Sequence, residues 1–231
     1  MSIKIENTVT PSCEQWEAII RGMRNPMNSW ANSDSYATYI EDPETGNAAD
    51  FEFFIGENDQ RLMETLAKGG PVHAKYRRMI PVFVDITAPI FWYKEFDTYK
   101  IGTVRNSCST MHKIHVKEFT IDDFSHEGCD EVGYAYEALE GLVDICERLR
   151  NDFNETGEKR YWRALIELLP EGFNMKSTLF LNYEVLVGIY RWRKDHKLDE
   201  WHTFCDWIKS LPYSELITLE FEEKEDIEND N

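Results

Sequence analysis

Residues 79–111 read MIPVFVDITAPIFWYKEFDTYKIGTVRNSCSTM, and this stretch decides the fold because three kinds of local structure follow one another within it. Residues 79–86 are β-branched and partly alternating, which predicts a strand, and Pro81 indicates either an edge strand or the start of a strand. Pro89 suits the first turn of a helix that we expect to run through Phe96. Residues 98–113 are predicted to form a loop rich in small polar side chains, a composition found in ligand-binding loops and in ordinary surface loops alike.

Helices are predicted on both sides of this stretch. Ser12 and Gln15 fit the capping box of a first helix that Asn25-Pro26 ends. A second helix is expected to begin at Asn58 or Asp59 and to stop at Gly69-Gly70-Pro71. The polar residues 31–50 are expected to form a loop, with a short hairpin as the alternative. The C-terminal part is expected to be mostly helical, over residues 139–149, 159–169, 178–192 and 199–211.

The domain organisation is predicted to be simple. We find no repeat, low-complexity tract or linker that would divide the chain, and its 231 residues are enough for one substantial core. Residues 220–231 carry seven acidic residues against Lys224. These features predict one domain over residues 1–218 and an acidic, disordered tail over residues 219–231.

Composition and charge exclude several classes of protein. Hydrophobic residues make up 42% of the chain, which is enough for a packed core. We find no apolar run long enough to cross a membrane and no apolar N-terminal stretch typical of a signal peptide, so we expect a cytoplasmic protein without a membrane partner. The net charge of −18 opposes binding to phosphate backbones, so no nucleic-acid partner is expected.

Cysteine and histidine patterns give little support for a metal centre. The five cysteines are scattered and show no CxxC spacing, which argues against a disulfide framework and a zinc site. His112 and His115 are three residues apart with Glu118 and His126 nearby, but histidines that bond to loop carbonyls or face solvent are the more frequent outcome of such spacing. We therefore predict no metal. Gly-rich dinucleotide, phosphate-loop and nucleophile-elbow motifs are absent from the sequence.

Two positive clusters interrupt the acidic sequence. One is formed by Lys68 and residues 75–78, and the other by four cations between Arg191 and Lys197. Arg193 and Lys197 would share one face of a helix, where Arg193 could hold a phosphate group in a bidentate contact. Spacing alone favours the simpler alternative, in which Arg193 pairs with Asp195 or Asp199 on a solvated face.

The stretch from Pro89 to Met111 resembles the signature region of the flavin-dependent thymidylate synthases. That family has an apolar Pro-Ile-Phe helix start, then Arg-Gln-Trp, then Arg-His-Arg-x-x-Ser, then Asn-x-x-Ser-x-Arg. Residues 89–91 match the first motif, residues 94–96 stand in place of Arg-Gln-Trp, and Asn106 and Ser109 match the Asn-x-x-Ser pair when one extra residue is allowed before Asn106.

Other parts of the family pattern follow in the same order over roughly residues 14–211. Ser29-Trp30 resembles a Ser-Phe pair that touches flavin, and His73 matches a histidine that precedes the first core strand of the family. Leu169-Pro170, Asn182 and Arg193 match a Leu-Pro, an asparagine and an arginine at the family's spacing. The resemblance implies that FAD is held by Ser29, His73, Lys100, Asn106 and Asn182, that Glu95, Ser109 and Arg193 bind the substrate, and that Ser109 and Arg193 act in catalysis.

Several basic residues of the family pattern are replaced in this chain. The Arg-His-Arg positions hold Thr98-Tyr99-Lys100, and the last arginine of the signature is Met111. The acidic residue within the Asn-x-x-Ser motif is Ser107, a helix arginine before Leu-Pro is Ile166, and an arginine two residues after Asn182 is Glu184. Lys100 and Arg193 are the main remaining cations of the set that binds nucleotide phosphate and flavin in the family.

The resemblance implies a single α+β domain with a small mixed or antiparallel sheet covered by helices, assembled as a homotetramer with ligand sites between subunits. The implied activity is reductive methylation of dUMP, or of a related pyrimidine nucleotide, with FAD, NADPH and methylene-tetrahydrofolate. Because losing one donor that stabilises developing charge costs roughly 100–1,000-fold in rate, the replaced cations leave two alternatives open. One is an inactive relative that binds nucleotide or flavin, and the other is a structural or interaction protein that kept the fold.

Overall fold

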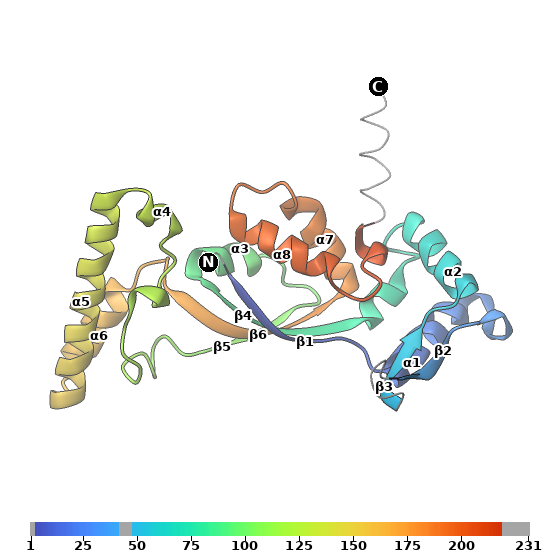
Figure 1. Cartoon of the computed structure of the whole chain (residues 1–231), viewed down its shortest axis with the longest axis horizontal. Coiled ribbons are helices and arrows are strands. Elements are labelled where there is room, and N and C mark those ends of the chain that lie inside the picture. Colours follow the sequence, from blue (N-terminus) through green and yellow to red (C-terminus); the bar gives the residue numbers. More distant parts are fainter. Residues whose placement is uncertain (1–2, 42–47, 219–231) are drawn as a thin grey trace, which may run out of the picture.

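The structure is a computed structural model that describes residues 3–41 and 48–218 (Figure 1). Its strands are β1 (Lys4–Val9), β2 (Tyr36–Glu41), β3 (Ala48–Phe54), β4 (Pro81–Pro89), β5 (Val104–Ser107) and β6 (Asn174–Asn182). Its α-helices are α1 (Cys13–Arg24), α2 (Glu57–Lys68), α3 (Ile90–Phe96), α4 (Glu127–Asp130), α5 (Gly133–Thr156), α6 (Lys159–Leu168), α7 (Tyr183–Arg193) and α8 (Asp199–Lys209). Short 3-10 turns are η1 (Asn25–Met27), η2 (Trp30–Asn32), η3 (Lys75–Met79) and η4 (Ile121–Asp123).

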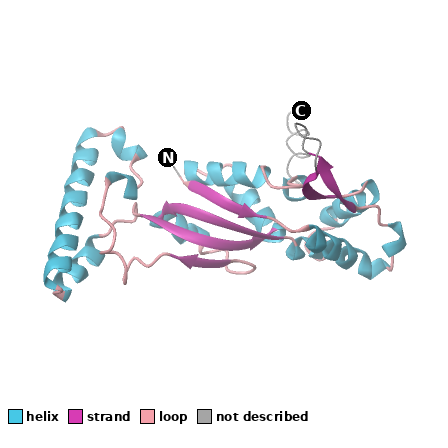
Figure 2. Ribbon diagram, turned by 60° about the horizontal axis from the view of Figure 1, so that its bottom comes forward, coloured by secondary structure: helices cyan, strands magenta, loops and turns pink. Residues whose placement is uncertain are grey.

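A four-stranded antiparallel sheet with the order β1-β4-β6-β5 forms the centre of the molecule (Figure 2). The strands β4 and β6 pair along their whole lengths, from Pro81 opposite Asn182 to Pro89 opposite Asn174. The predicted strand is thus confirmed as β4, and of the two interpretations of Pro81 the strand start is the right one, because β4 is an interior strand. The predicted α+β class with a small antiparallel sheet is confirmed as well.

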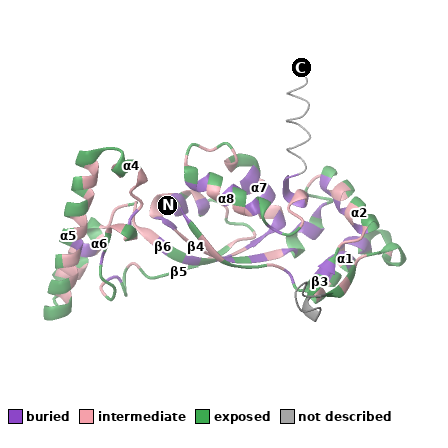
Figure 3. Cartoon of the chain, in the orientation of Figure 1, coloured by how far each residue is buried: buried purple, intermediate pink, exposed green. Residues whose placement is uncertain are grey.

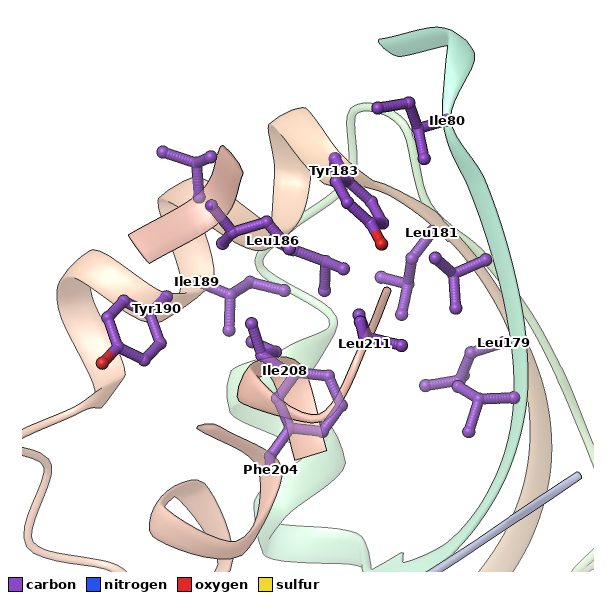
Figure 4. Packing of buried hydrophobic residues seen from close by; sticks show 14 of the residues in the cluster. Ile80, Leu179, Leu181, Tyr183, Leu186, Ile189, Tyr190, Phe204, Ile208 and Leu211 are labelled. Atoms are coloured by element: carbon purple, nitrogen blue, oxygen red, sulfur yellow. The ribbon is translucent and has the colours of Figure 1, made fainter. Parts of the chain in front are cut away.

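The main core lies between one face of this sheet and the helices α3, α7 and α8 (Figures 1 and 4). Residues of β4 and β6 alternate between buried and more exposed, as expected when one face of a sheet packs on helices and the other does not. Figure 4 shows Leu179 and Leu181 of β6 facing Leu186, Ile189 and Ile208 of the covering helices. In both ribbon views, the opposite face of the sheet carries no helix of the described residues.

A second, smaller apolar cluster lies in the lobe formed by α4, α5 and α6, at the left of Figure 3. Cys146 of α5 and Leu165 of α6 are fully buried in it. Three residues of the segment before α4 are buried beside them: Ile114, Phe119 and Phe124. The stripe predicted for residues 139–149 and the helix predicted for residues 159–169 are confirmed as α5 and α6. The lobe therefore supports the segment that follows β5.

The prediction of a mostly helical C-terminal part is wrong for residues 174–182, which form β6. Periodicity does not separate a short apolar strand from a buried helix, and the apolar run 178–192 combines the end of β6 with α7. The alternation of Met175, Ser177, Leu179 and Leu181, all buried, was the signal of a strand. The predicted loop 98–113 likewise contains a short strand, β5, which pairs with β6.

The N-terminal helices follow the prediction with one change. Ser12 and Gln15 form the capping box of α1, which ends before Asn25-Pro26 as predicted. The helix α2 begins at Glu57, one residue before the predicted cap, because Asp34 accepts hydrogen bonds from the Asn58 and Asp59 amides at 3.0 and 3.2 Å and caps the helix from another segment.

The hairpin alternative for residues 31–50 is confirmed, since β2 pairs with β3, while residues 42–47 between the two strands lie outside the described residues. The proposed tail, residues 219–231, also lies outside them. Within the described part of the chain, no helix is long and apolar enough to cross a bilayer.

Candidate functional site

Glu95 and Arg193, both predicted to bind substrate, form an ion pair. The guanidinium Nη1 of Arg193 donates to a Glu95 carboxylate oxygen at 2.7 Å, and its Nε donates to the hydroxyl group of Tyr99 at 2.9 Å. The Arg193 side chain is 16% exposed, so it does not lie on a solvated helix face. The partner is Glu95 of α3 rather than the Asp195 or Asp199 of the alternative interpretation, and two of the three guanidinium nitrogens are engaged within the chain.

Aromatic rings enclose this ion pair. The guanidinium carbon of Arg193 lies 4.6 Å from the ring centroid of Trp201 and 5.6 Å from that of Tyr99, a cation–π arrangement. The indole nitrogen of Trp201 donates to the same Glu95 oxygen at 2.9 Å, and Nε2 of His196 lies 3.4 Å from it. The Glu95 carboxylate thus ties α3 to α7 and α8. The sequence did not point to Tyr99, Trp201 or His196. Tyr99 belongs to no recognisable motif, and Trp201 and His196 are distant from Glu95 in the chain.

Asn182 lies against a tight turn at Gly102, two residues after Lys100 in the sequence. Asn182 caps α7, with its side-chain oxygen accepting from the Val185 amide at 3.1 Å. Gly102 has φ of +81°, and a Cβ atom at this position would lie 2.9 Å from both the Asn182 amide nitrogen and a Val185 methyl group. Only glycine allows this approach, which places the exposed Lys100 two residues before the contact.

The Asn106 and Ser109 positions lie on β5 and on the loop that follows it. Asn106 is exposed and faces Thr178 of β6. The hydroxyl oxygen of Ser109 accepts from the His112 amide at 2.8 Å and from the Met111 amide at 3.3 Å, which turns the loop back on itself. The indole nitrogen of Trp162 in α6 donates to the Met111 carbonyl at 2.7 Å, so the smaller lobe fixes this turn.

Ser109 opens onto a pocket of about 390 Å³ at the end of the sheet that faces the smaller lobe. This volume is within the range of small-molecule sites, roughly 300–1,000 Å³. The strands contribute Thr87, Asn174 and Lys176, and the segment after β5 contributes most of the remaining wall. The pocket is lined by Thr87, Cys108, Ser109, Thr110, Lys113, Ile114, Lys117, Glu118, Phe119, Asp123, Phe173, Asn174 and Lys176. We refer to it as the Ser109 pocket.

His73 and Ser29 lie in the region of α1 and α2. His73 is exposed and lines a second pocket, of about 410 Å³, with residues of α1, η1 and α2. The Ser29 hydroxyl and carbonyl groups accept from the guanidinium of Arg24 at 3.3 and 3.2 Å. Since η3 packs against both α1 and α7, this region and the Asn182 region share a neighbour.

Behind Ser29 is a buried polar network that the sequence did not reveal. The Nε of Arg24 donates to Asp59, both side chains being almost fully buried. Asp59 also accepts from the hydroxyl groups of Ser33 and Ser35, each at 2.7 Å. Burial by itself raises the pKa of the Asp59 carboxyl group, but the hydrogen bonds from Ser35, Ser33 and Arg24 outweigh it and the net pKa lies below the usual value.

Within one chain, the predicted residues are therefore divided among separate places. Glu95 and Arg193 are in direct contact, and Asn182 lies against the turn at Gly102, two residues after Lys100. Ser109 lines its own pocket, and His73 lines another. Among the described residues, no group of three or more His, Cys, Asp or Glu side chains is arranged to hold a metal ion, and all five cysteines are free thiols.

Comparison of the chain with known proteins gives matches in structure only. No family model matches the sequence, and no curated protein matches it. The flavin-dependent thymidylate synthase ThyX from Helicobacter pylori, complexed with FAD and dUMP, superposes with a TM-score of 0.61 at 13% identity, over 94% of this chain and 96% of that one. A second structure of that enzyme with FAD and dUMP also gives a TM-score of 0.61, at 14% identity.

The UMP/dUMP methylase PolB from Streptomyces cacaoi, bound with 5-Br dUMP, gives a TM-score of 0.63 at 13% identity, over 95% of this chain and 96% of that one. At such identities the likeness concerns the fold, and it extends over nearly the whole of each chain. This chain therefore has the α+β fold shared by flavin-dependent thymidylate synthases and this UMP/dUMP methylase.

Proposed function

We propose that the chain is an enzyme of the flavin-dependent thymidylate synthase type, which methylates dUMP or a related pyrimidine nucleotide reductively with FAD, NADPH and methylene-tetrahydrofolate. The observation that carries the proposal is the Ser109 pocket, because the serine at the signature position of the resemblance opens onto a cavity of nucleotide size. The fold supports it, since the structures that resemble this chain contain dUMP or 5-Br dUMP.

The proposed substrate residues are Ser109, Glu95 and Arg193. Ser109 is exposed at the pocket, and its hydroxyl hydrogen is available to donate because its oxygen is the acceptor in the hydrogen bonds from the Met111 and His112 amides. Arg193 would stabilise negative charge on the substrate as a positioned cation, and Glu95 would fix the orientation of its guanidinium group. In a single chain these groups are held in separate places, so the proposal requires ligand sites between subunits of a homotetramer.

The proposed flavin residues are Ser29, His73, Lys100, Asn106 and Asn182. Three of them, His73, Lys100 and Asn106, present exposed polar side chains that a ligand can reach, while Ser29 and Asn182 are held in place by Arg24 and Val185. Side chains of these types can donate hydrogen bonds to the phosphate, ribose and ring edges of a flavin nucleotide. When bound, FAD would supply the reducing equivalents of the reaction, and NADPH would renew them.

A second candidate, an inactive relative that binds nucleotide or flavin, is favoured by one specific observation. The Arg193 guanidinium already donates to Glu95 and to Tyr99, so its charge is largely compensated before any substrate binds. The positions of two further family arginines hold Met111 and Ile166, which cannot donate hydrogen bonds from their side chains. Such a protein would bind the ligands and turn nothing over.

A turnover experiment separates the two candidates. Purified protein is incubated with dUMP, FAD, NADPH and methylene-tetrahydrofolate, and the nucleotide is analysed by mass spectrometry. An active enzyme gives a product heavier than dUMP by the added methyl group, and leaving out FAD or the folate abolishes it. We expect Ser109→Ala to reduce the rate by at least tenfold and His112→Ala, a change beside the same turn, to leave it within about twofold. Bound flavin with no methylated product would establish the inactive relative instead.

A further inference from the structure

The Ser109 pocket gathers three lysines in a chain whose net charge is −18. Lys113 and Lys117 come from the segment after β5, and Lys176 comes from β6. Lys113 and Lys117 are close together in the sequence, but Lys176 is distant from both. Only the fold brings the three side chains to one cavity. A concentration of cations in an otherwise acidic molecule reverses the local field and favours an anionic ligand.

The three lysines differ in the ion pairs that they already form within the chain. The Lys117 amine lies 2.5 Å from an Asp123 carboxylate oxygen, and the Lys176 amine lies 3.3 Å from Asp85 and 3.7 Å from Glu6. Both side chains are at least half exposed, so these ion pairs are of the weak, solvent-screened kind. Lys113 is exposed, and within the described ranges of the chain it has no acidic partner at ion-pair distance. A ligand phosphate can therefore recruit these amines without breaking a buried interaction.

The wall beneath the lysines is apolar and aromatic. Ile114 and Phe119 are 8% and 6% exposed, and the rings of Phe119 and Phe173 lie 6.1 Å apart between centroids. Polar groups at the rim, from Thr87, Ser109, Thr110 and Asn174, can donate or accept hydrogen bonds. The pocket thus combines a cationic part, an apolar floor and a few hydrogen-bonding groups, which suits a ligand with an anion at one end and a flat ring at the other.

Hydrogen bonds to the smaller lobe and to the sheet hold the segments that line the pocket. Besides the Trp162 contact with Met111, the side-chain amide of Asn154 in α5 donates to the His115 carbonyl at 3.1 Å. The Phe119 amide donates to Glu147 of α5 at 3.0 Å, and the Cys108 amide donates to the Lys176 carbonyl at 2.9 Å. The segment carrying Lys113 and Lys117 is therefore fixed to the lobe and the sheet in the absence of ligand, which lowers the ordering cost of binding.

We propose that the Ser109 pocket binds a pyrimidine nucleoside monophosphate, with Lys113, Lys117 and Lys176 as its phosphate-binding cations and the Phe119–Phe173 wall against its ring. The proposal rests on the function proposed above and changes the assignment of the phosphate anchor. The position of the last signature arginine holds Met111, and Arg193 is engaged by Glu95 and Tyr99. The three lysines supply the positive charge that those positions lack.

Calorimetric titration of dUMP and of deoxyuridine, its phosphate-free counterpart, tests this assignment. We expect Lys113→Ala and Lys176→Ala each to weaken dUMP binding by about tenfold, and the double variant to weaken it by more, because each removes a charged contact to phosphate. Deoxyuridine, lacking the phosphate, should bind each variant as it binds the wild type. Lys209→Ala, which removes an exposed lysine of α8 paired with Asp206, is the matched control and should leave dUMP binding unchanged.

Alkylation of Cys108 provides an independent measure of where the nucleotide binds. Cys108 is exposed and lines the Ser109 pocket, whereas Cys146 and Cys205 are buried elsewhere. We expect saturating dUMP to slow the reaction of Cys108 with iodoacetamide at least fivefold. Peptide mass spectrometry follows the label at each cysteine, and labelling of Cys13 and Cys129, which are partly exposed, serves as the internal control and should not change.

Weakened dUMP binding in the lysine variants together with protection of Cys108 would support the proposal. If wild type binds dUMP while the lysine variants bind it equally well, or if Cys108 is not protected, the phosphate site lies elsewhere and the assignment is overturned, although the proposed function stands. If wild type binds neither dUMP nor UMP, the assignment is also overturned. A separate FAD titration of the same protein then decides whether the proposed function survives as flavin binding.

Discussion

Glu95, which we propose to bind substrate, also connects three helices of the fold. Its carboxylate accepts from Arg193 of α7 and from Trp201 of α8, and His196 is near it. These two donors, from α7 and α8, hold both helices against α3 before any substrate is present. The resemblance assigned Glu95 and Arg193 to substrate binding, and the structure adds that the two residues stabilise each other.

The first prediction concerns Arg193. Arg193→Ala removes a charge-assisted hydrogen bond to a partly buried carboxylate, so we expect the free energy of unfolding to fall by about 1–3 kcal/mol. Arg193→Lys should recover only part of this loss, because an ammonium group cannot donate to Glu95 and Tyr99 in the planar arrangement of a guanidinium. Urea denaturation of the three proteins measures the differences. Unchanged stability in Arg193→Ala would mean that the ion pair has no structural role and is available to a substrate.

The second prediction concerns the pH dependence of stability through Asp59. The pKa of Asp59 in the folded state lies below its usual value of about 3.9. The charged carboxylate therefore contributes its full stabilisation at pH values above about 3.9, and this contribution is lost as the pH falls through the folded-state pKa. Asp59→Asn should lower stability at pH 7, by about 3 kcal/mol, since it leaves the buried Arg24 without its charge partner.

The variant should also lose stability less steeply than wild type as the pH falls below about 3.9. Denaturation curves at several pH values compare the two slopes. Asp34→Asn is a useful control, because Asp34 caps α2 through its side chain but is not bonded to Arg24. If the stability of wild type and of Asp59→Asn changes with pH in parallel, Asp59 is not responsible for the pH dependence.

At the scale of elements, the lobe of α5 and α6 supports the Ser109 pocket. We predict that Leu165→Ala, which empties a fully buried position of the lobe, destabilises it by about 2–5 kcal/mol. Backbone amides of α5, α6 and residues 108–119 should exchange hydrogen faster, while amides of β4 should not, since β4 belongs to the main core. Leu168→Ala on the same helix, where the side chain is 45% exposed, is the matched control. Equal acceleration in β4 would mean that the two clusters unfold as one unit.

Elements with local signals were predictable from the sequence. The capping box at Ser12 and Gln15, the Asn25-Pro26 stop and the β-branched run of β4 all depend on neighbouring residues, and each was predicted. The strands β5 and β6 were not, because short strands gain their stability from partners distant in sequence. The start of α2 was displaced for the same reason, since its capping group comes from Asp34.

The site was predictable only in part, for a related reason. The resemblance supplied Glu95 and Arg193 by position, and the structure shows that they touch. Nothing in the sequence links Lys176 to Lys113, because they are 63 residues apart in the chain. Only the pairing of β5 with β6 brings them to one pocket. Assignments for Ser29, His73, Lys100, Asn106 and Asn182 stay predictions.

At the scale of the whole molecule, the uncovered face of the sheet carries an apolar row across all four strands. Val9 pairs with Phe83, Phe83 with Phe180, and Phe180 with Val104, while Phe83 is 47% and Val104 61% exposed. An exposed apolar row of this length is typical of a surface that another protein covers. It is consistent with the homotetramer that the resemblance implies, in which a second copy of the chain would cover it.

The fourth prediction follows from this row. Light scattering after size-exclusion chromatography should give the wild type a mass four times 27.2 kDa. Phe83→Asp should lower the mass by weakening the interface, with little effect on folding because the side chain is half exposed in the single chain. Tyr134→Asp, at an 80% exposed aromatic residue of α5, is the control and should keep the wild-type mass. A monomeric wild type would contradict both the assembly and the proposal that ligand sites lie between subunits.

The most direct test of the proposed function is the visible absorbance spectrum of the purified protein, recorded as isolated and again after incubation with excess FAD and dUMP followed by desalting. We predict the absorbance bands of a bound flavin in at least the second spectrum, with about one chromophore per chain, which denaturation releases and mass spectrometry identifies as FAD. A colourless protein in both spectra would contradict the account, because the fold would then be retained without the cofactor on which the proposed chemistry depends.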